Sequence, residues 1–102
     1  MTDFINVADV NELKEGECKI VEINKKSVAL FNINGIFYAI DNTCPHAHGP
    51  LGEGQLDGNT VTCPWHGWKF NVTTGISPVN PNVKVQRYDV KVEGDKIKLK
   101  MQ

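Results

Sequence analysis

The stretch that decides the fold runs from residue 27 to residue 41 and reads SVALFNI, then NG, then IFYAID. Both arms are rich in β-branched and aromatic residues, which favour strands. The Asn34-Gly35 pair between them favours a tight hairpin, because both residues can take the positive φ angles of a two-residue turn. The stretch therefore predicts two antiparallel strands.

Short β-rich runs continue on both sides of this hairpin. They are separated by turn signals such as Asp57-Gly58-Asn59 and Gly94-Asp95, and no window keeps apolar residues at helical spacing for more than about two turns. Asp9 to Glu15 allow a single helical turn. The chain is thus predicted to be all-β. The expected strands are Phe4 to Val7, Cys18 to Ile23, Ser27 to Ile33, Ile36 to Asp41, Thr60 to Cys63, Trp68 to Asn71, Tyr88 to Glu93 and Lys96 to Met101.

Length and charge limit the classes of protein that fit. The 102 residues are 40% hydrophobic and suffice for one compact core, so residues 1–102 are predicted to form a single domain. Eleven basic and twelve acidic residues leave no basic stripe, which argues against a nucleic-acid partner. The N-terminus shows no export leader, and no run approaches the roughly 20 apolar residues that span a bilayer. We therefore expect a soluble cytoplasmic protein with no membrane partner.

Glycine, proline, histidine, cysteine and both tryptophans concentrate between residues 42 and 75. There the chain reads Cys44-Pro45-His46 and, after sixteen intervening residues, Cys63-Pro64-Trp65-His66. In an extended segment, residues two apart point the same way, so Cys44 and His46 can reach one target. Three cysteines in a chain with no export signal favour metal binding over a disulfide framework. Two thiolates and two imidazoles suit either a tetrahedral zinc site or the outer ligands of a two-iron cluster.

The C-x-H and C-x-x-H pairs, with Gly67 following, resemble the two cluster loops of Rieske proteins. Further residues are similar to those that frame the cluster in small Rieske ferredoxins, so the resemblance covers nearly the whole chain: Gly49-Pro50-Leu51, Glu53-Gly54, Trp68-Lys69-Phe70 and Thr74-Gly75. The resemblance implies an antiparallel β-sandwich base with a small inserted cluster-binding subdomain at about residues 42–72. It also implies one [2Fe-2S] cluster per chain, with Cys44 and Cys63 on the inner iron and His46 and His66 on the outer iron.

The same resemblance implies a low reduction potential within the family window of roughly −150 to +300 mV. High-potential Rieske proteins carry a disulfide between the loops at positions matching Gly49 and Trp65 here. They also carry hydroxyl donors to sulfur at positions matching Trp68 and Phe70. This chain has neither feature at these positions, so the reduced cluster is expected to be less stabilised.

The resemblance implies a one-electron carrier rather than an enzyme. Such a carrier takes electrons from a flavin-containing NAD(P)H-dependent reductase and passes them to a terminal oxygenase or a similar redox enzyme. The chain itself is not expected to be an oxygenase. A Rieske oxygenase needs a separate mononuclear iron held by two histidines and a carboxylate. Only His48 is left for such a site once His46 and His66 bind the cluster. Two alternatives remain: the small subunit of a nitrite-reductase-type complex, which shares the fold, and a zinc-stabilised binding module without redox activity.

The other distinctive side chains receive minor roles. His48 is expected to be a non-ligand, near the cluster or on the surface, and Cys18 to be a small apolar side chain on a strand. Trp65 is a candidate partner contact. Pro81 or Pro78 matches the proline-bearing loop that covers the cluster in Rieske ferredoxins.

Overall fold

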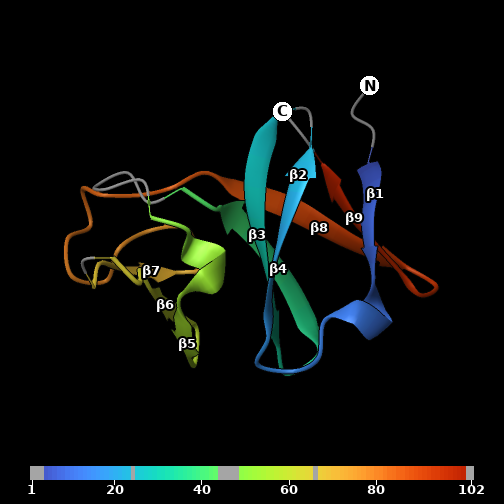
Figure 1. Ribbon diagram of the computed structural model, residues 1–102, viewed down its shortest axis with the longest axis horizontal. Helices are drawn as coiled ribbons and strands as arrows, with labels where there is room; N and C mark the ends of the chain where they lie inside the picture. The colour runs from blue at the N-terminus through green and yellow to red at the C-terminus, as the bar shows by residue number, and fades with distance from the viewer. Residues whose placement is uncertain (1–3, 24, 44–48, 66, 101–102) are drawn as a thin grey trace.

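The computed structural model describes residues 4–23, 25–43, 49–65 and 67–100, which form two antiparallel sheets (Figure 1). The large sheet has the strand order β1-β9-β8-β4-β3-β2, and the small sheet has the order β5-β6-β7. The small sheet falls between β4 and β8 in the chain. The elements are β1 (Phe4–Asp9), the 3-10 turn η1 (Val10–Glu12), β2 (Cys18–Ile23), β3 (Lys26–Ile33), β4 (Ile36–Asp41), the 3-10 turn η2 (Leu51–Glu53), β5 (Gln55–Asp57), β6 (Thr60–Thr62), β7 (Lys69–Asn71), β8 (Arg87–Glu93) and β9 (Lys96–Lys100).

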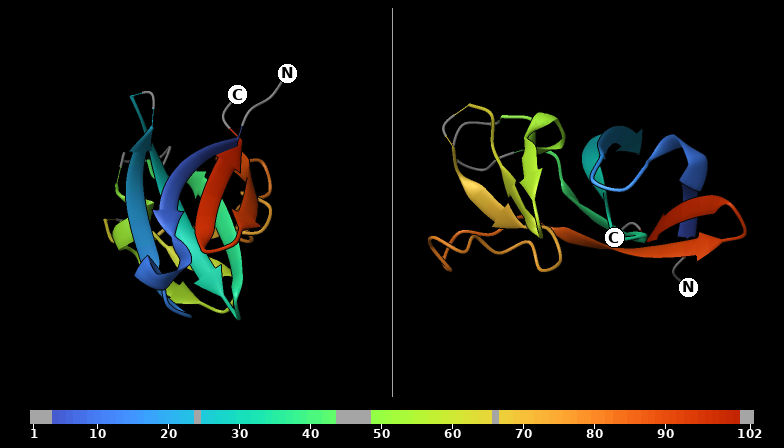
Figure 2. Two further views of the ribbon diagram at one scale, coloured as in Figure 1. Left: turned by 90° about the vertical axis from the view of Figure 1, so that its right-hand side faces the viewer. Right: turned by 90° about the horizontal axis from the view of Figure 1, so that it is seen from below.

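The large sheet folds over on itself, so that β1 and β9 face β2 and β3 across a core (Figure 2). Strand β3 is buried at every position from residue 28 to residue 32, and its side chains alternate between two faces. Val28 and Leu30 pack inside the curled sheet, whereas Ala29 and Phe31 pack in a second core beneath the small sheet. This double burial explains why the strand is almost continuously apolar.

The predicted central hairpin is confirmed. Ile33 pairs with Ile36, and the two turn residues Asn34 and Gly35 have φ angles of 54° and 85°. The Gly35 amide also donates a 2.9 Å hydrogen bond to the Oδ1 atom of Asn32. The turn therefore has the positive φ angles that the Asn-Gly pair predicts.

The all-β class is confirmed, and each predicted strand is present with ends shifted by no more than two residues, Met101 lying outside the described residues. Among the described residues, five predicted strand ends differ from the observed ends. Two of them, Cys63 and Trp68, lie just outside β6 and β7, where they close a loop. Strand β5 and the turn η2 were not predicted. No helix in the described part of the chain is long and apolar enough to cross a membrane. The single-domain boundary of 1–102 stays a prediction.

Candidate metal centre

The second predicted ligand pair lies on a tight loop between β6 and β7. The Cys63 amide donates a 2.6 Å hydrogen bond to the Trp68 carbonyl, and the Gly67 amide donates a 3.0 Å bond to the Cys63 carbonyl. Gly67 has a φ of 74°, which residues with a Cβ rarely adopt. Pro64 and Trp65 are exposed, while Cys63 is only 1% exposed. His66 lies outside the described residues.

The first predicted ligand pair belongs to the segment between β4 and η2. Cys44, His46 and His48 lie outside the described residues, but both ends of the segment are described. Thr43 forms an isolated bridge with Pro50. Thr43 and Pro50, which flank the segment that contains the first ligand pair, are therefore held side by side.

Gly49 brings the two loops together. A Cβ added at Gly49 would lie 2.7 Å from the Sγ atom of Cys63, a distance that real Cβ atoms essentially never show. Because glycine lacks that atom, the first loop can approach the thiol this closely. The Cys63 thiol therefore faces Gly49, which directly follows the undescribed residues 44–48.

Gly49 and Trp65, the positions matched to the disulfide of high-potential Rieske proteins, are neighbours. The added Cβ of Gly49 would lie 3.3 Å from the Cβ of Trp65. Of the two positions matched to hydroxyl donors, Phe70 is fully buried and Trp68 is partly buried against the same core. A glycine–tryptophan contact thus stands where high-potential Rieske proteins have the disulfide. Apolar packing of Trp68 and Phe70 stands where those proteins have the hydroxyl donors.

The donor chemistry and the surroundings of Cys63 fit an iron–sulfur cluster. Cysteine is a soft sulfur ligand that suits such clusters. Cys63 packs in an apolar core with Leu51, Val61 and Phe70, which limits the access of water and lowers the local dielectric constant. Within the described residues no three His, Cys, Asp or Glu side chains could hold a metal ion together, as expected when three of the four predicted ligands lie outside them.

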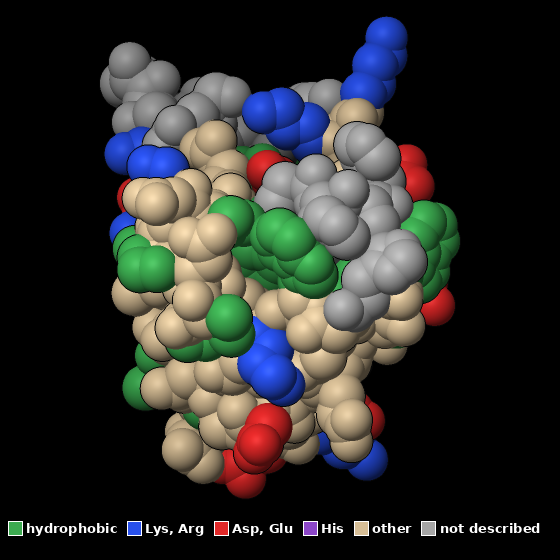
Figure 3. All heavy atoms as spheres, turned by 90° about the vertical axis from the view of Figure 1, so that its left-hand side faces the viewer, with side chains coloured by type: hydrophobic (Ala, Val, Ile, Leu, Met, Phe, Trp, Pro, Cys, Tyr) green, Lys and Arg blue, Asp and Glu red, His purple; other side chains and the backbone are tan. Residues whose placement is uncertain are grey.

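A groove runs between the second loop and the segment 77–80. Ser77 anchors this segment, because its buried Oγ accepts 3.3 Å hydrogen bonds from the amides of Val79 and Asn80. Val79 itself is 76% exposed, and Pro78 and Pro81 are also exposed. Figure 3 views the end of the molecule that carries the small sheet, and hydrophobic side chains gather near the middle of this face. The groove is lined by Gly67, Trp68, Lys69, Ser77, Val79 and Asn80.

Two titratable groups lie in the scaffold around the loops. The Tyr88 hydroxyl donates a 2.7 Å hydrogen bond to Asp41 at the end of β4, and burial together with this bond raises the pKa of Tyr88 far above its usual value. Burial also raises the pKa of the Cys18 thiol to about 11. Cys18 packs against the core beneath the small sheet, which agrees with its predicted apolar role.

Residues 3–92 match the family described as the Rieske [2Fe-2S] domain, so the chain belongs to the Rieske [2Fe-2S] family. The predicted Rieske fold and the predicted [2Fe-2S] cofactor are thereby confirmed. A zinc-only module is not supported.

Within this family the chain is similar to ferredoxins of dioxygenase systems. It is 35% identical to the ferredoxin component of the naphthalene 1,2-dioxygenase/salicylate 5-hydroxylase systems of a Ralstonia species, over 98% of this chain and 97% of the relative. It is 29% identical, with a TM-score of 0.87, to a chain in the solved complex of reduced oxygenase and oxidised ferredoxin of carbazole 1,9a-dioxygenase, over 95% of this chain and 92% of that chain. These relatives confirm the predicted class, an electron carrier rather than an enzyme.

A third likeness concerns the fold alone. A structure assigned as the small subunit of an NADH-dependent nitrite reductase from Mycobacterium tuberculosis has a TM-score of 0.91 and 20% identity, over 100% of this chain and 97% of that chain. The shared fold expected for such subunits is therefore observed.

Sequence reasoning missed one residue at the base of the first loop. Asn42 is buried and makes hydrogen bonds to two other segments, Ser27 of β3 and Leu51–Gly52 of η2. Its position two residues before the first cysteine was the available signal, because asparagine side chains often bond neighbouring backbone groups at loop ends.

Proposed function

We propose that Cys44 and Cys63 bind the inner iron of the cluster and that His46 and His66 bind the outer iron. The observation that carries this proposal is the buried Cys63 thiol, which faces Gly49 and the first loop. Pro64 and Trp65, which precede His66 in the chain, are exposed.

The cluster, when bound, accepts and releases one electron. Two thiolates and two neutral imidazoles leave the reduced cluster less negative than four thiolates would, so that reduction is easier than in an all-cysteine ferredoxin. Trp68 and Phe70 offer no hydroxyl to the sulfur atoms, which supports a potential near the low end of the Rieske range. The protein's own contribution is to bring the two ligand segments together at Gly49 and Cys63 and to exclude water from Cys63.

The proposed electron path runs from a flavin-containing NAD(P)H-dependent reductase to a terminal oxygenase, in the cytoplasm. Two related proteins support this path. The Ralstonia relative is a ferredoxin component of dioxygenase systems, and the carbazole 1,9a-dioxygenase ferredoxin forms a complex with its oxygenase. The alternative, a subunit of a nitrite-reductase-type complex, has support only from a 20% identical structure, which shows the fold alone. No observation favours it over the ferredoxin role.

The cofactor is tested on protein prepared without oxygen. We expect about two irons and two sulfides per chain, a Rieske-type visible spectrum and a low-average-g EPR signal on reduction. Zinc as the sole metal in such a sample would contradict the proposed function.

The ligand assignment is tested with two histidines of the same loop. His46→Ala should lose the Rieske EPR signal, because one iron loses an imidazole ligand. His48→Ala is the matched control, two positions away, and should keep the spectrum and the potential of the wild type. The opposite pattern would transfer the ligand role to His48.

A further inference from the structure

Asn42 ties the entrance of the first loop to two other segments of the chain. It is 8% exposed, its Nδ2 donates to the Ser27 Oγ at 3.1 Å, and its Oδ1 accepts from the Gly52 amide at 2.7 Å. Its own amide donates to the Ser27 carbonyl at 3.0 Å, and its carbonyl accepts from the Leu51 amide at 2.6 Å. The start of the loop is therefore tied both to its end and to strand β3.

The exit of this loop is held by packing. Leu51 is fully buried, and a Cβ added at Gly52 would lie 2.9 Å from the Oδ1 atom of Asn42 and closer still to Ile20. Since Leu51 and Gly52 have so little room, the hydrogen bonds of Asn42 determine where the entrance of the loop lies relative to its exit. Cys44 follows Asn42 by only two residues, so a displaced entrance moves the first ligand.

We propose that Asn42 is a positioning residue, which holds the first ligand loop where Cys44 and His46 meet the ligands of the second loop. This inference rests on the proposed function, because it requires ligands in both loops. Residues that orient metal ligands change metal affinity by about ten- to hundredfold when they are removed. Removal of a buried asparagine with a purely structural role lowers only the stability of the fold.

Asn32 is a matched control for Asn42. It is 6% exposed, its Nδ2 donates to the Leu13 carbonyl at 2.8 Å, and its Oδ1 accepts from the Gly35 amide at 2.9 Å. The two asparagines share residue type, burial and a pair of side-chain hydrogen bonds. Asn32 lies near the opposite end of β3 from Ser27, beside the β3–β4 turn.

The experiment measures release of the cluster from the holoprotein into a chelator, well below the melting temperature of each variant, together with the EPR spectrum and the midpoint potential. Asn42→Ala should release the cluster at least about tenfold faster than the wild type and should alter the EPR spectrum. Asn42→Asp should restore the release rate, because one carboxylate oxygen accepts from Gly52 and the Ser27 hydroxyl can donate to the other. Asn32→Ala should lower the melting temperature without changing release or EPR.

Two outcomes would overturn the proposal: equally fast release from Asn32→Ala and Asn42→Ala, or wild-type release and EPR in Asn42→Ala. If Asn42→Ala does not assemble, Ser27→Ala replaces it, because it removes one of the two side-chain hydrogen bonds. Ser27→Ala is then expected to release the cluster faster than the wild type, and an unchanged release rate would reject the positioning role. A wild-type protein without a cluster would instead contradict the proposed function, so the two failures are distinguishable.

Discussion

Single residues decide how closely the two ligand loops approach each other. Gly49 has no side chain at the point where the first loop passes Cys63, and Asn42 closes the same loop at its base. Protein interiors are packed to high density, so an extra atom at such a contact forces a shift of the backbone or of its neighbour. Changes at these residues should therefore affect the cluster more than the strands.

Replacing Gly49 with alanine should lower the amount of cluster held per folded chain. The added Cβ would lie 2.7 Å from the Sγ atom of Cys63, so one loop must move away. The measurement is iron content and visible absorbance, normalised to folded protein. Gly58→Ala is the control, because its Cβ meets nothing within 4 Å although its φ of 62° strains alanine. Equal iron loss in both variants would show that the contact with Cys63 is not the cause of the loss.

Replacing Tyr88 with phenylalanine should lower the free energy of unfolding by about 1–2 kcal/mol, because it leaves Asp41 without its buried donor. The measurement is equilibrium unfolding in urea at neutral pH, where the raised pKa keeps the Tyr88 hydroxyl protonated. Tyr38→Phe, a partly buried tyrosine of β4, is the matched control and should cost less. Equal losses in the two variants would contradict a specific role for the Tyr88–Asp41 bond.

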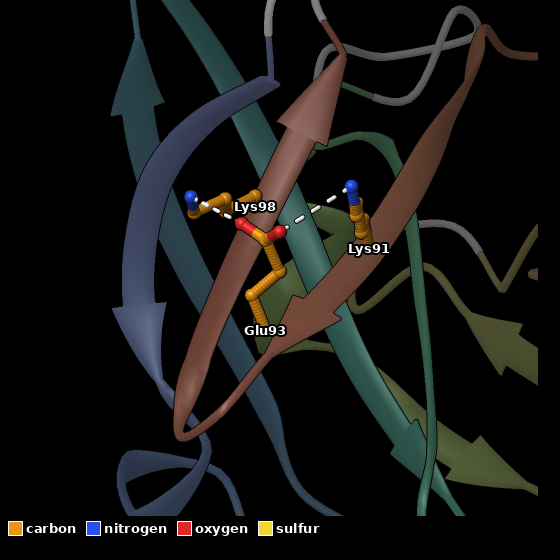
Figure 4. Close-up of polar contacts among 3 residues, drawn as sticks. All are labelled: Lys91, Glu93 and Lys98. Carbon is orange, nitrogen blue, oxygen red and sulfur yellow. Dashed lines mark hydrogen bonds and ion pairs between the residues drawn. The ribbon is translucent and has the colours of Figure 1, made fainter.

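At the scale of elements, the β8–β9 hairpin carries a charged face on one side. Lys91 and Lys98 lie directly opposite each other in the register, an arrangement in which like charges repel. Glu93 lies between them, accepting a 2.6 Å hydrogen bond from Lys98 and pairing with Lys91 at 3.4 Å (Figure 4). The bond from Lys98, followed by the charge of Lys91, lowers the pKa of Glu93.

The stability contributed by Glu93 should depend on pH. A carboxylate whose pKa is lowered on folding stabilises the fold above its unfolded pKa of about 4.3, and this contribution is lost as the pH falls through the folded pKa. Glu93→Gln should therefore melt below the wild type at pH 7, with a small difference that salt reduces. As the pH falls through the folded pKa of Glu93, the melting temperatures should converge. A difference that stays the same from neutral to acidic pH would show that the charge is not its cause.

For the molecule as a whole, charge lies mainly away from the predicted cluster end. Residues 42–86 contain only four of the eleven basic and twelve acidic residues, two of each sign: Glu53, Asp57, Lys69 and Lys84. The view in Figure 3 shows most charged side chains toward the margin of this end. Because local charges of opposite sign balance, long-range steering of a partner toward this end is expected to be weak.

A charge added beside this end should change the rates of reaction with charged oxidants in opposite directions. Val79 is 76% exposed next to the second loop. In Val79→Asp, oxidation of the reduced protein by hexaammineruthenium(III), a cation, should become about three- to tenfold faster at low ionic strength. Oxidation by ferricyanide, an anion, should become slower by a similar factor.

Both rates are measured by stopped-flow absorbance. Val92→Asp is the matched control, since Val92 is 44% exposed on the β8–β9 hairpin of the large sheet, and it should change neither rate. Similar rates in the two variants would show that the electron does not leave near Val79.

The features that sequence alone determined depend on residues that are close together in the chain. Runs of β-branched and aromatic residues located the strands, the Asn34-Gly35 pair located the central turn, and the spacing of the Cys and His pairs led to the Rieske family. Such patterns are readable because a strand, a turn or a short motif is defined by its own backbone preferences and side-chain types.

Only the tertiary structure decided which distant residues meet. The contact of Gly49 with Cys63, the bonds of Asn42 to Ser27 and Gly52, and the bond of Tyr88 to Asp41 each join different elements. Contacts of this kind follow from the order of strands in space and from close packing, which no short stretch of sequence encodes.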